Sequence, residues 1–368
     1  MALLVVHVFG VMDRGGAESV ALDLCRQVPA AEVHQILVTL SGRKGSMAEL
    51  FEDTGAEVEP LPLRPLLTFP LRWMIFLSRV RPDVVVSHVS LPSAFLLLLA
   101  RLAGVPVRVA RLHSEGDGRV ATRPRRVLRA ALRVTFVGAA TEILGVTRAA
   151  CLFGTGGLRA LDARTRVLPN GVDLEKFHPE RSQSLRSDLQ LSERDFLVLH
   201  VGRAALEKNR RFLLGVSWYL VDKTSTVLLL VGPGGSADLN LDNVDLSALP
   251  RLVIFGERDD IPRLMQSADV LVLPSTREGL PGVVFEALAC GTPVIATDLP
   301  GLREVQKNLQ GLTLIALAAG PVYWAAAIDA SRRTTPSQRA NIRASFERSP
   351  FGLTASVDQW RAVWQGRR

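Results

Sequence analysis

Short apolar runs alternate with helix-like segments along almost the whole chain, and this alternation constrains the fold more than any other feature. In the first half the strand-like runs are Leu3–Val8, Gln35–Thr39, Val84–Ser87, Val107–Leu112 and Thr141–Val146. Helical patterns fall between them, at Ser19–Gln27, Ser46–Asp53, Leu71–Val80 and Leu96–Ala103. Strands that are separated by helices pair in parallel, so the pattern predicts an α/β fold with helices on both faces of the sheet.

A second series of strand-like runs follows a turn-rich connector at Leu168–Pro179, which predicts a second sheet. Its runs are Phe196–Val201, Thr226–Val231, Leu252–Phe255, Val270–Pro274 and Pro293–Thr297. The tail carries Phe351, Val357, Trp360 and Trp364 at near-helical spacing and predicts a terminal amphipathic helix. We expect one domain over residues 1–170, a second over 171–349 and the helix over 350–368. Doubly wound sheets bind ligands at the carboxyl ends of their strands, so a ligand is expected in a cleft between the domains.

The charge of the chain favours acidic partners. Its 368 residues carry a formal net charge of +8, so phosphates, nucleic acid and anionic lipid all qualify on charge alone. The three scattered cysteines lack metal-ligand spacing and fit buried thiols in a reducing compartment. The apolar run Ala94–Leu102 is about half the length needed to span a bilayer and predicts a buried helix. Met1–Phe9 lacks a basic leader and is interpreted as a strand, not a signal peptide.

Two glycines, Gly15 and Gly16, stand in the turn between the first strand-like run and the first helical pattern. Glycine lets a backbone approach a ligand closely, and the amides that begin a helix favour an anion. An ordinary tight turn would use the same residues. The pattern is neither a G-x-G-x-x-G dinucleotide fingerprint nor a P-loop, which argues against NAD enzymes and NTPases.

Two cations follow the first strand of the second series. Arg203 comes directly after that strand, and Lys208 precedes the next helix. An arginine and a lysine so placed can converge on one diphosphate. As isolated surface cations they would be unremarkable; their position at the expected ligand-binding edge favours a functional role.

The most specific pattern is segment 274–288, in which Glu278 and Glu286 are separated by seven residues. Glu278 lies in a loop after a strand, and Glu286 lies in the helical stretch that follows. Carboxylates accept hydrogen bonds from neighbouring hydroxyl groups, so this pair suits a hydroxyl-rich ligand. The loop between them could hold a phosphate or sugar oxygen at a helix N-terminus, through Gly279, Leu280, Pro281 and Gly282.

In order and spacing these motifs resemble the retaining glycosyltransferases of family 4, which have the GT-B fold and include bacterial enzymes of cell-surface polysaccharide synthesis. The resemblance covers nearly the whole chain, through Gly15–Glu18, PNGVD at 169–173, VGR…EKN at 201–209, FGERDDIPRL at 255–264, ADVLVLPS at 268–275 and EGLPGVVFEALACGTPVIAT at 278–297. It implies two Rossmann-like domains that face each other across a cleft, with the C-terminal helix packed back on the N-terminal domain.

The resemblance also implies roles for particular residues. Arg203 and Lys208 would bind the donor diphosphate, and Glu278 with the loop that follows would hold the donor sugar. Glu286 would bind the ribose hydroxyls. Gly15 and Gly16 would contact the pyrophosphate, and the turn Gly256–Arg258 would contact the base. His113 resembles the active-site histidine near the sugar, the role of His88 stays open, and four histidines are interpreted as structural: His7, His34, His178 and His200.

We expect the donor to be a nucleotide diphosphate sugar, UDP-linked, with no cofactor and no metal. The chain contains no D-x-D triplet, and Arg258 interrupts the acidic cluster at 257–260. Arg203, Lys208 and helix-start amides would then neutralise the leaving diphosphate. The resemblance implies attack on the same face as the leaving group, with retention of configuration.

Two stretches of the N-terminal domain are basic and amphipathic. The first holds arginines 119, 123, 125, 126, 129 and 133, and the second holds arginines 64, 72, 79 and 81. Such segments suit an anionic membrane surface, and we expect Trp73 and Phe76 of the second stretch to insert into it. Ordinary solvated helices are the other interpretation. Nucleic acid is disfavoured because no recognised binding module accompanies the charge.

The acceptor is expected to be lipid-linked or another glycan, which would place the protein in the cytoplasm, peripheral on the inner face of the plasma membrane. Two other functions stay open. One is a UDP-sugar 2-epimerase with the same fold, which needs no second sugar substrate. The other is a catalytically inactive nucleotide-sugar-binding partner, against which the intact Arg203, Lys208, Glu278 and Glu286 argue.

Overall fold

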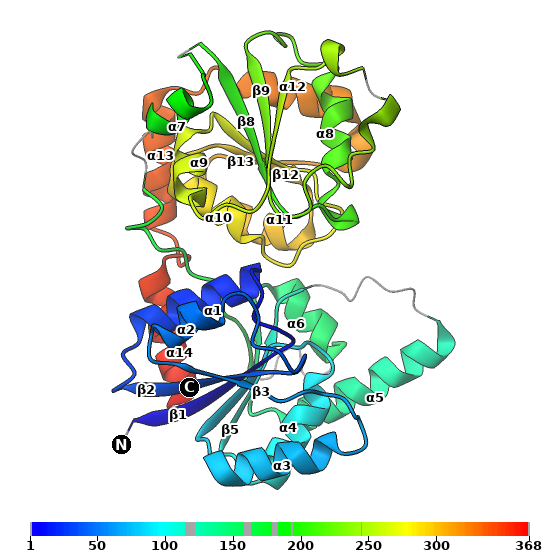
Figure 1. Cartoon of the computed structure of the whole chain (residues 1–368), viewed down its shortest axis with the longest axis vertical. Coiled ribbons are helices and arrows are strands. Elements are labelled where there is room, and N and C mark those ends of the chain that lie inside the picture. The colour runs from blue at the N-terminus through cyan, green and yellow to red at the C-terminus, as the bar shows by residue number, and fades with distance from the viewer. Residues whose placement is uncertain are drawn as a thin grey trace. The chain divides into compact units, whose positions relative to one another are not determined.

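In the computed structural model the chain forms two α/β units, each built on its own parallel sheet (Figure 1). The structure describes residues 2–114, 122–157, 163–178, 183–192, 194–243 and 245–366. Unit 1 comprises Met1–Gly171 and Leu353–Arg368, and unit 2 comprises Val172–Gly352. The chain therefore passes between units at two places, beside the boundaries expected at 170/171 and 349/350.

The sheet of unit 1 has the strand order β3-β2-β1-β4-β5-β6-β7, which reverses direction at β1 and so makes it doubly wound. The strands are β1 (Leu3–Phe9), β2 (Val33–Thr39), β3 (Glu57–Pro60), β4 (Val84–Ser87), β5 (Val107–Leu112), β6 (Glu142–Gly145) and β7 (Thr165–Val167). The helices are α1 (Gly16–Gln27), α2 (Ala48–Glu52), α3 (Phe69–Val80), α4 (Ser93–Leu102), α5 (Arg123–Ala139), α6 (Arg148–Thr155) and α14 (Leu353–Trp364).

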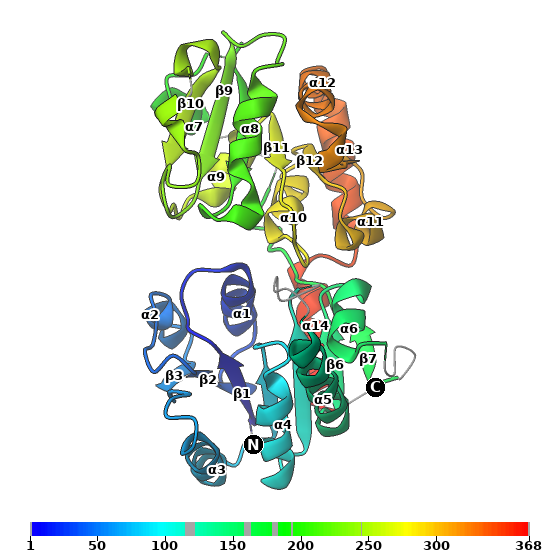
Figure 2. The same ribbon diagram turned by 90° about the vertical axis from the view of Figure 1, so that its right-hand side faces the viewer.

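The terminal helix α14 completes the core of unit 1. Trp360 and Trp364 are buried in one cluster with sheet residues such as Val84 and Val109 and with Leu24 of α1. Helices α1 and α14 lie side by side on this face, whereas α3, α4 and α5 follow one another on the opposite face (Figure 2). The expected return of the C-terminal helix to the N-terminal domain is thereby confirmed.

The sheet of unit 2 has the order β10-β9-β8-β11-β12-β13, again doubly wound. Its strands are β8 (Phe196–Val201), β9 (Thr226–Val231), β10 (Arg251–Phe255), β11 (Val270–Leu273), β12 (Val294–Thr297) and β13 (Leu312–Ile315). Its helices are α7 (Gln183–Asp188), α8 (Arg210–Ser217), α9 (Ile261–Ser267), α10 (Gly282–Ala289), α11 (Pro300–Gln306), α12 (Pro321–Ser331) and α13 (Pro336–Glu347), with 3₁₀ turns η1 (Leu206–Lys208), η2 (Leu241–Asn243), η3 (Leu246–Ala248) and η4 (Leu317–Ala319). Trp324 of α12 is fully buried against α8 and the central strands.

Three strands were not expected from the sequence: β3, β7 and β13. Each lies at an edge of its sheet. An edge strand is covered less completely than a central one, and these three keep partly or fully exposed residues, as β7 does along its whole length. They therefore lack the continuous apolar run that marks a central parallel strand.

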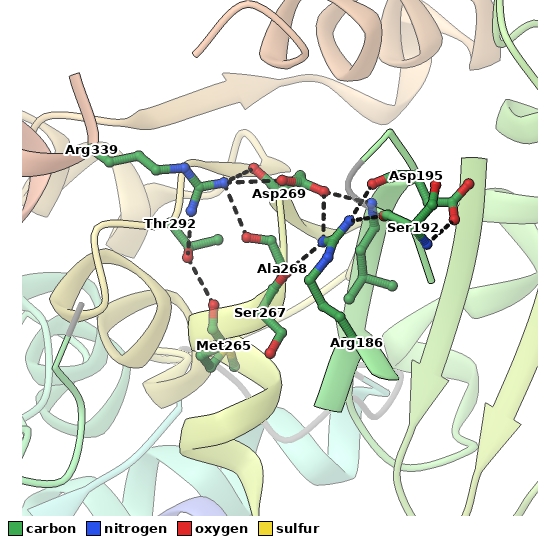
Figure 3. A network of polar contacts seen from close by, with 10 residues as sticks. Arg186, Ser192, Asp195, Met265, Ser267, Ala268, Asp269, Thr292 and Arg339 are labelled. Atoms are coloured by element: carbon green, nitrogen blue, oxygen red, sulfur yellow. Dashed lines mark hydrogen bonds and ion pairs between the residues drawn. The ribbon is translucent and has the colours of Figure 1, made fainter. Parts of the chain in front are cut away.

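A polar network joins the start of β11 to two helices of unit 2 (Figure 3). One carboxylate oxygen of Asp269 accepts the backbone N–H of Leu197 at 2.8 Å and lies 3.4 Å from Arg186 of α7. Arg339 of α13 approaches the other oxygen at 3.6 Å and donates to the backbone carbonyls of Ala268 and Asp269. The charges of this half-buried cluster are thus paired and hydrogen-bonded, as burial requires.

Candidate functional site

The loops after β8 and β9 touch at the carboxyl edge of the unit 2 sheet. Gly232 has a φ of 143°, and a Cβ atom there would lie 2.3 Å from the carbonyl oxygen of Gly202. Only glycine can occupy this position, because another side chain would push the two backbones apart. The contact fixes the path of the chain just before Arg203. Arg203 itself is largely exposed, and its guanidinium lies 2.6 Å from the Glu207 carboxylate.

Lys208 and Glu278, from two different loops, form a largely buried ion pair. The ammonium Nζ lies 2.6 Å from Oε1 of Glu278, and both side chains are less than one-fifth exposed. Two further contacts hold these loops together: the Thr276 amide donates to the carbonyl of Glu207 at 2.8 Å, and the Asn209 side chain donates to the carbonyl of Pro274 at 3.1 Å. The pair is therefore fixed by backbone contacts on both sides.

Glu286 lies in the second turn of α10 and is half-buried. Its Oε1 atom would be 3.6 Å from a Cβ placed on Gly282, so the carboxylate lies back over the first turn of the helix. The loop expected to bind an oxygen ends here, with Pro281 as the N-cap and Gly282 as the first helical residue. Proline has no N–H, so donors in this loop come from Gly279, Leu280 and Gly282.

His200, interpreted from the sequence as structural, lies beside Gly202, where the loop that carries Arg203 and Lys208 begins. It is fully buried, and its Nδ1 lies 2.9 Å from the carbonyl of Val272, to which it donates. A Cβ on Gly202 would be 3.1 Å from its Nε2 and 3.2 Å from the Lys208 side chain, so the imidazole and the lysine flank Gly202. Burial lowers the pKa of His200 to about 4 and keeps the ring neutral beside the Lys208 cation.

Arg258 is engaged within its own turn. Its guanidinium donates two hydrogen bonds to Asp260, at 2.7 and 2.6 Å, and lies 4.7 Å from the centre of the Phe255 ring. The Asp260 carboxylate raises the pKa of Arg258. The turn is therefore ordered by its own residues, and any contact with a base would be made by an arginine already fixed in place. Among the described residues no cluster of three or more His, Cys, Asp or Glu side chains is arranged to hold a metal ion.

In unit 1, Gly15 and Gly16 begin α1, but a carboxylate already lies at this helix terminus. Gly15 is the N-cap in an extended conformation, and a Cβ there would collide with the side chain of Glu18. Gly16 has open space around its Cα. Burial raises the pKa of Glu18, against the opposing effect of a hydrogen bond from its own amide. An incoming phosphate would have to share the helix start with this side chain.

His113 and His88 are brought together by the sheet, and His7 joins them. Nδ1 of His7 lies 3.1 Å from Nε2 of His88, and Nδ1 of His88 lies 2.9 Å from Nε2 of His113. The neighbouring Arg111 is fully buried and binds the carbonyl of Leu168 and the side-chain oxygen of Asn170, at 2.5 and 2.9 Å. The sequence analysis interpreted His7 as structural, because a histidine inside a strand carries no motif of its own.

The expected insertion of Trp73 and Phe76 into a membrane is wrong. Trp73 is fully buried, Phe76 is 3% exposed, and the Trp73 indole donates to the carbonyl of Leu96. The aromatic residues form the core face of α3. Large apolar side chains that reach solvent are Leu71 at 65% and Ile75 at 58% exposure in α3, and Leu66 at 63% and Leu67 at 96% just before it.

The basic stretch at 119–133 is only partly an exposed surface. Arg119 lies outside the described residues. Arg123 and Arg126 of α5 are exposed, whereas Arg125, Arg129 and Arg133 are half-buried, and Arg133 donates to the carbonyl of Phe153. Three large apolar residues of α5 are also exposed: Val127, Leu128 and Val134. No helix in the described ranges is long and apolar enough to cross a bilayer.

Comparisons with known proteins match both units to glycosyltransferase families. The family described as Glycosyltransferase Family 4 matches residues 14–176, and the family described as Glycosyl transferases group 1 matches residues 195–331. The chain is 28% identical over 362 residues to the putative glycosyltransferase EpsF of Bacillus subtilis, covering 96% of this chain and 94% of EpsF. It is also 28% identical over 239 residues to an Escherichia coli UDP-Gal:alpha-D-GlcNAc-diphosphoundecaprenol alpha-1,3-galactosyltransferase, covering 63% of this chain and 62% of that enzyme.

The fold matches solved structures over its full length. The structure of HepE from Anabaena, in complex with UDP and glucose, superimposes with a TM-score of 0.82 at 20% identity and covers 99% of this chain and 100% of HepE. The two doubly wound sheets are thus those of the GT-B fold. With both halves matched by transferase families in the expected order, the chain belongs to the family 4 glycosyltransferases of the GT-B fold.

Proposed function

We propose that this glycosyltransferase moves a sugar, with retention of configuration and without a metal, from a UDP-sugar to a lipid-linked or glycan acceptor in cell-surface polysaccharide synthesis. The observation that carries the proposal is the Lys208–Glu278 pair at the carboxyl edge of unit 2. In this pair a cation that would bind a diphosphate lies next to a carboxylate that would bind sugar hydroxyls. The UDP and glucose bound by HepE and the diphosphoundecaprenol acceptor of the E. coli relative support the substrate classes.

Lys208 is chemically suited to stabilise the leaving nucleotide diphosphate. An ammonium has three N–H donors, and the bond to Glu278 uses one of them, so two could reach phosphate oxygens. A cation that is already largely buried and fixed needs little reorganisation when negative charge develops on the departing nucleotide. Arg203, exposed and paired with Glu207, would add a second cation. Glu278 would accept hydrogen bonds from the sugar while holding Lys208 in place.

The test is product analysis with a panel of UDP- and GDP-sugars and a cell lipid extract. We expect UDP release only when acceptor is present, an α-linked product from an α-linked donor, and activity that survives EDTA. Lys208→Ala and Arg203→Ala should each lower turnover roughly a hundredfold or more, as expected for a lost transition-state charge contact. Lys307→Ala, at an exposed lysine of the same unit, is the control.

The possible outcomes separate the competing functions. A β-linked product would contradict retention. Epimerised UDP-sugar formed without acceptor would identify an epimerase, and UDP binding without turnover over the whole panel would identify an inactive partner. Wild-type rates in both cation variants would overturn the roles given to Arg203 and Lys208.

A lipid-linked acceptor would require unit 1 to lie against a membrane, and we propose that the α3 and α5 surface makes this contact. Exposed Arg123 and Arg126 provide charge, and exposed Leu67, Leu71 and Ile75 provide apolar contact. Each basic residue near an anionic surface contributes about 1 kcal/mol, which salt screens, whereas the apolar contribution persists.

Liposome sedimentation tests this surface. The protein should bind anionic vesicles at low salt and largely leave them at high salt, and Arg123→Glu with Arg126→Glu should abolish binding while UDP affinity is kept. The charge-matched control is Arg251→Glu with Arg348→Glu, at exposed positions of unit 2. If the wild type ignores anionic vesicles at low salt, the acceptor is a soluble glycan.

A further inference from the structure

Three histidines from neighbouring strands of unit 1 form one continuous chain of rings. His7 lies in β1, and His88 and His113 directly follow β4 and β5, which are adjacent strands in the order β1-β4-β5. The links are 3.1 Å from His7 Nδ1 to His88 Nε2 and 2.9 Å from His88 Nδ1 to His113 Nε2. Phe9 stacks on the middle ring at 4.1 Å between centroids and holds it in this orientation.

All three imidazoles are neutral at pH 7. Burial lowers the pKa of His7 to about 4, partly opposed by the nearby Gln35 side chain. Burial lowers the pKa of His113 to about 3, with a further contribution from the Arg111 cation. Burial, followed by the neighbouring histidines and Arg111, holds the pKa of His88 well below its ordinary value. Each ring therefore carries one N–H and one acceptor nitrogen.

Neutral rings linked in this way cannot choose their tautomers independently. Each link needs one donor and one acceptor, so if His7 donates from Nδ1, His88 must carry its proton on Nδ1 and donate to His113 Nε2. His113 then carries its proton on Nδ1. The only other arrangement that satisfies both links reverses every proton and leaves an N–H on Nε2 of His7.

His7, at the buried end of the three linked histidines, decides between the two arrangements. Nε2 of His7 is buried and has no partner in normal hydrogen-bond geometry among the described residues. The polar side chain near this ring is Gln35, which interacts with it closely enough to raise its pKa, and the Gln35 side-chain oxygen already accepts from the Cys25 thiol. The edges of Trp360 and Trp364 of α14 surround this ring, at 6.3 and 6.1 Å between centroids. A buried N–H without an acceptor is the rarer of the two unsatisfied states in proteins, so the lone pair belongs at this position.

We propose that His7 and His88 are positioning residues that fix His113 in the Nδ1–H tautomer, so that its free ring nitrogen is a hydrogen-bond donor and never a base. His113 is partly exposed and lies at the other end of the three linked histidines. A donor of this kind would bind a sugar or acceptor hydroxyl oxygen but could not remove its proton. This consequence rests on the proposed function, whereas the tautomer itself does not.

The tautomer can be read directly by long-range ¹H–¹⁵N correlation spectra of histidine-labelled protein at pH 7.5, with resonances assigned from single variants. We expect His113 in the wild type to be protonated on Nδ1. His7→Leu, which removes the donor to His88, should convert His113 into a mixture of tautomers. His7→Asn keeps an N–H donor at the position of Nδ1, and His88→Asn keeps one toward His113, so both should preserve the single tautomer.

Kinetics give the matching readout. His7→Leu should lower kcat about tenfold while KM for the donor and UDP affinity stay unchanged, and His7→Asn should recover most of the loss. An Nε2–H tautomer in wild-type His113, or an unchanged tautomer in folded His7→Leu, would overturn the proposal. If no transfer is found for the wild type, the proposed function fails, and the spectra alone decide the tautomer.

Discussion

At the scale of single residues, Glu278 and Glu286 both lie at the carboxyl edge of the unit 2 sheet but are held by different elements. We therefore expect them to have different roles. Glu278 is held by the Lys208 ammonium, so under the proposed function it would lie between the donor diphosphate and the sugar. Glu286 is carried by the rigid helix α10 and lies over its first turn. A ribose bound to Glu286 belongs to the nucleotide, whereas Glu278 would face only the sugar.

The two glutamates should therefore affect nucleotide binding differently. Glu286→Ala should weaken UDP binding roughly tenfold or more, because a hydrogen bond to a charged group contributes about 1.5–3 kcal/mol. Glu278→Gln, whose amide oxygen can still accept from Lys208, should leave UDP affinity nearly unchanged and strongly reduce transfer. Calorimetric titration with UDP measures both, with the exposed Glu175→Ala as control. Equal losses of UDP affinity in the two variants would contradict the assignment.

The contacts of individual histidines could not be predicted from this sequence. His113 follows a strand in a recognisable motif, but His7 and His200 sit inside strands among apolar neighbours and were interpreted as structural. Their significance depends on what the adjacent strand contributes: His88 for His7, and the Lys208 loop for His200. No local pattern encodes that pairing.

At the scale of elements, the spacing of apolar residues carries information that composition does not. The buried residues of α3 are Phe69, Trp73, Phe76 and Leu77, which recur as one helical stripe. That stripe faces the core, so the aromatic side chains cannot reach a membrane. Leu71 and Ile75 lie off the stripe and are exposed.

The Asp269 network should control the stability of unit 2, because it joins the N-terminal ends of the central strands β8 and β11 to α7 and α13 (Figure 3). Asp269→Ala leaves Arg186 and Arg339 with less compensation in a half-buried site, at a cost of about 3–5 kcal/mol in the free energy of unfolding. Urea denaturation of unit 2, followed by circular dichroism, measures the loss. Asp242→Ala, at an exposed position, should change it by less than about 0.5 kcal/mol, and an equally small change in Asp269→Ala would refute this role.

At the scale of the whole molecule, the chain closes unit 1 with its last helix. Leu353, Val357, Trp360, Val363 and Trp364 of α14 all belong to the unit 1 core, although they follow the whole of unit 2 in sequence. Arg111 ties this helix to the segment that leaves unit 1, since it stacks on Trp360 and binds Asn170. Unit 1 therefore depends on residues from both ends of the chain.

Truncation after Gly352 should unfold unit 1 and leave unit 2 folded. Loss of α14 removes two buried tryptophans, and a single Trp→Ala change in a core already costs about 3–5 kcal/mol. Limited proteolysis with mass spectrometry should show rapid cleavage within residues 1–171 and protection of 172–352. The full-length chain with Trp218→Ala, a partly exposed tryptophan of unit 2, is the control. Equal protection of both units in the truncated chain would contradict this dependence.

The sequence by itself determined the two sheets, the positions of their central strands along the chain and the loops that carry Arg203, Lys208, Glu278 and Glu286, because central parallel strands are buried on both faces and have continuous apolar sequences. The tertiary structure alone decided the edge strands β3, β7 and β13, the Lys208–Glu278 pair, the burial of Trp73 and the contacts that link His7, His88 and His113. Each of these features depends on contacts between residues far apart in sequence. The spacing of apolar residues indicates which face of a helix or strand is buried, but it does not indicate which residues of other elements pack against that face.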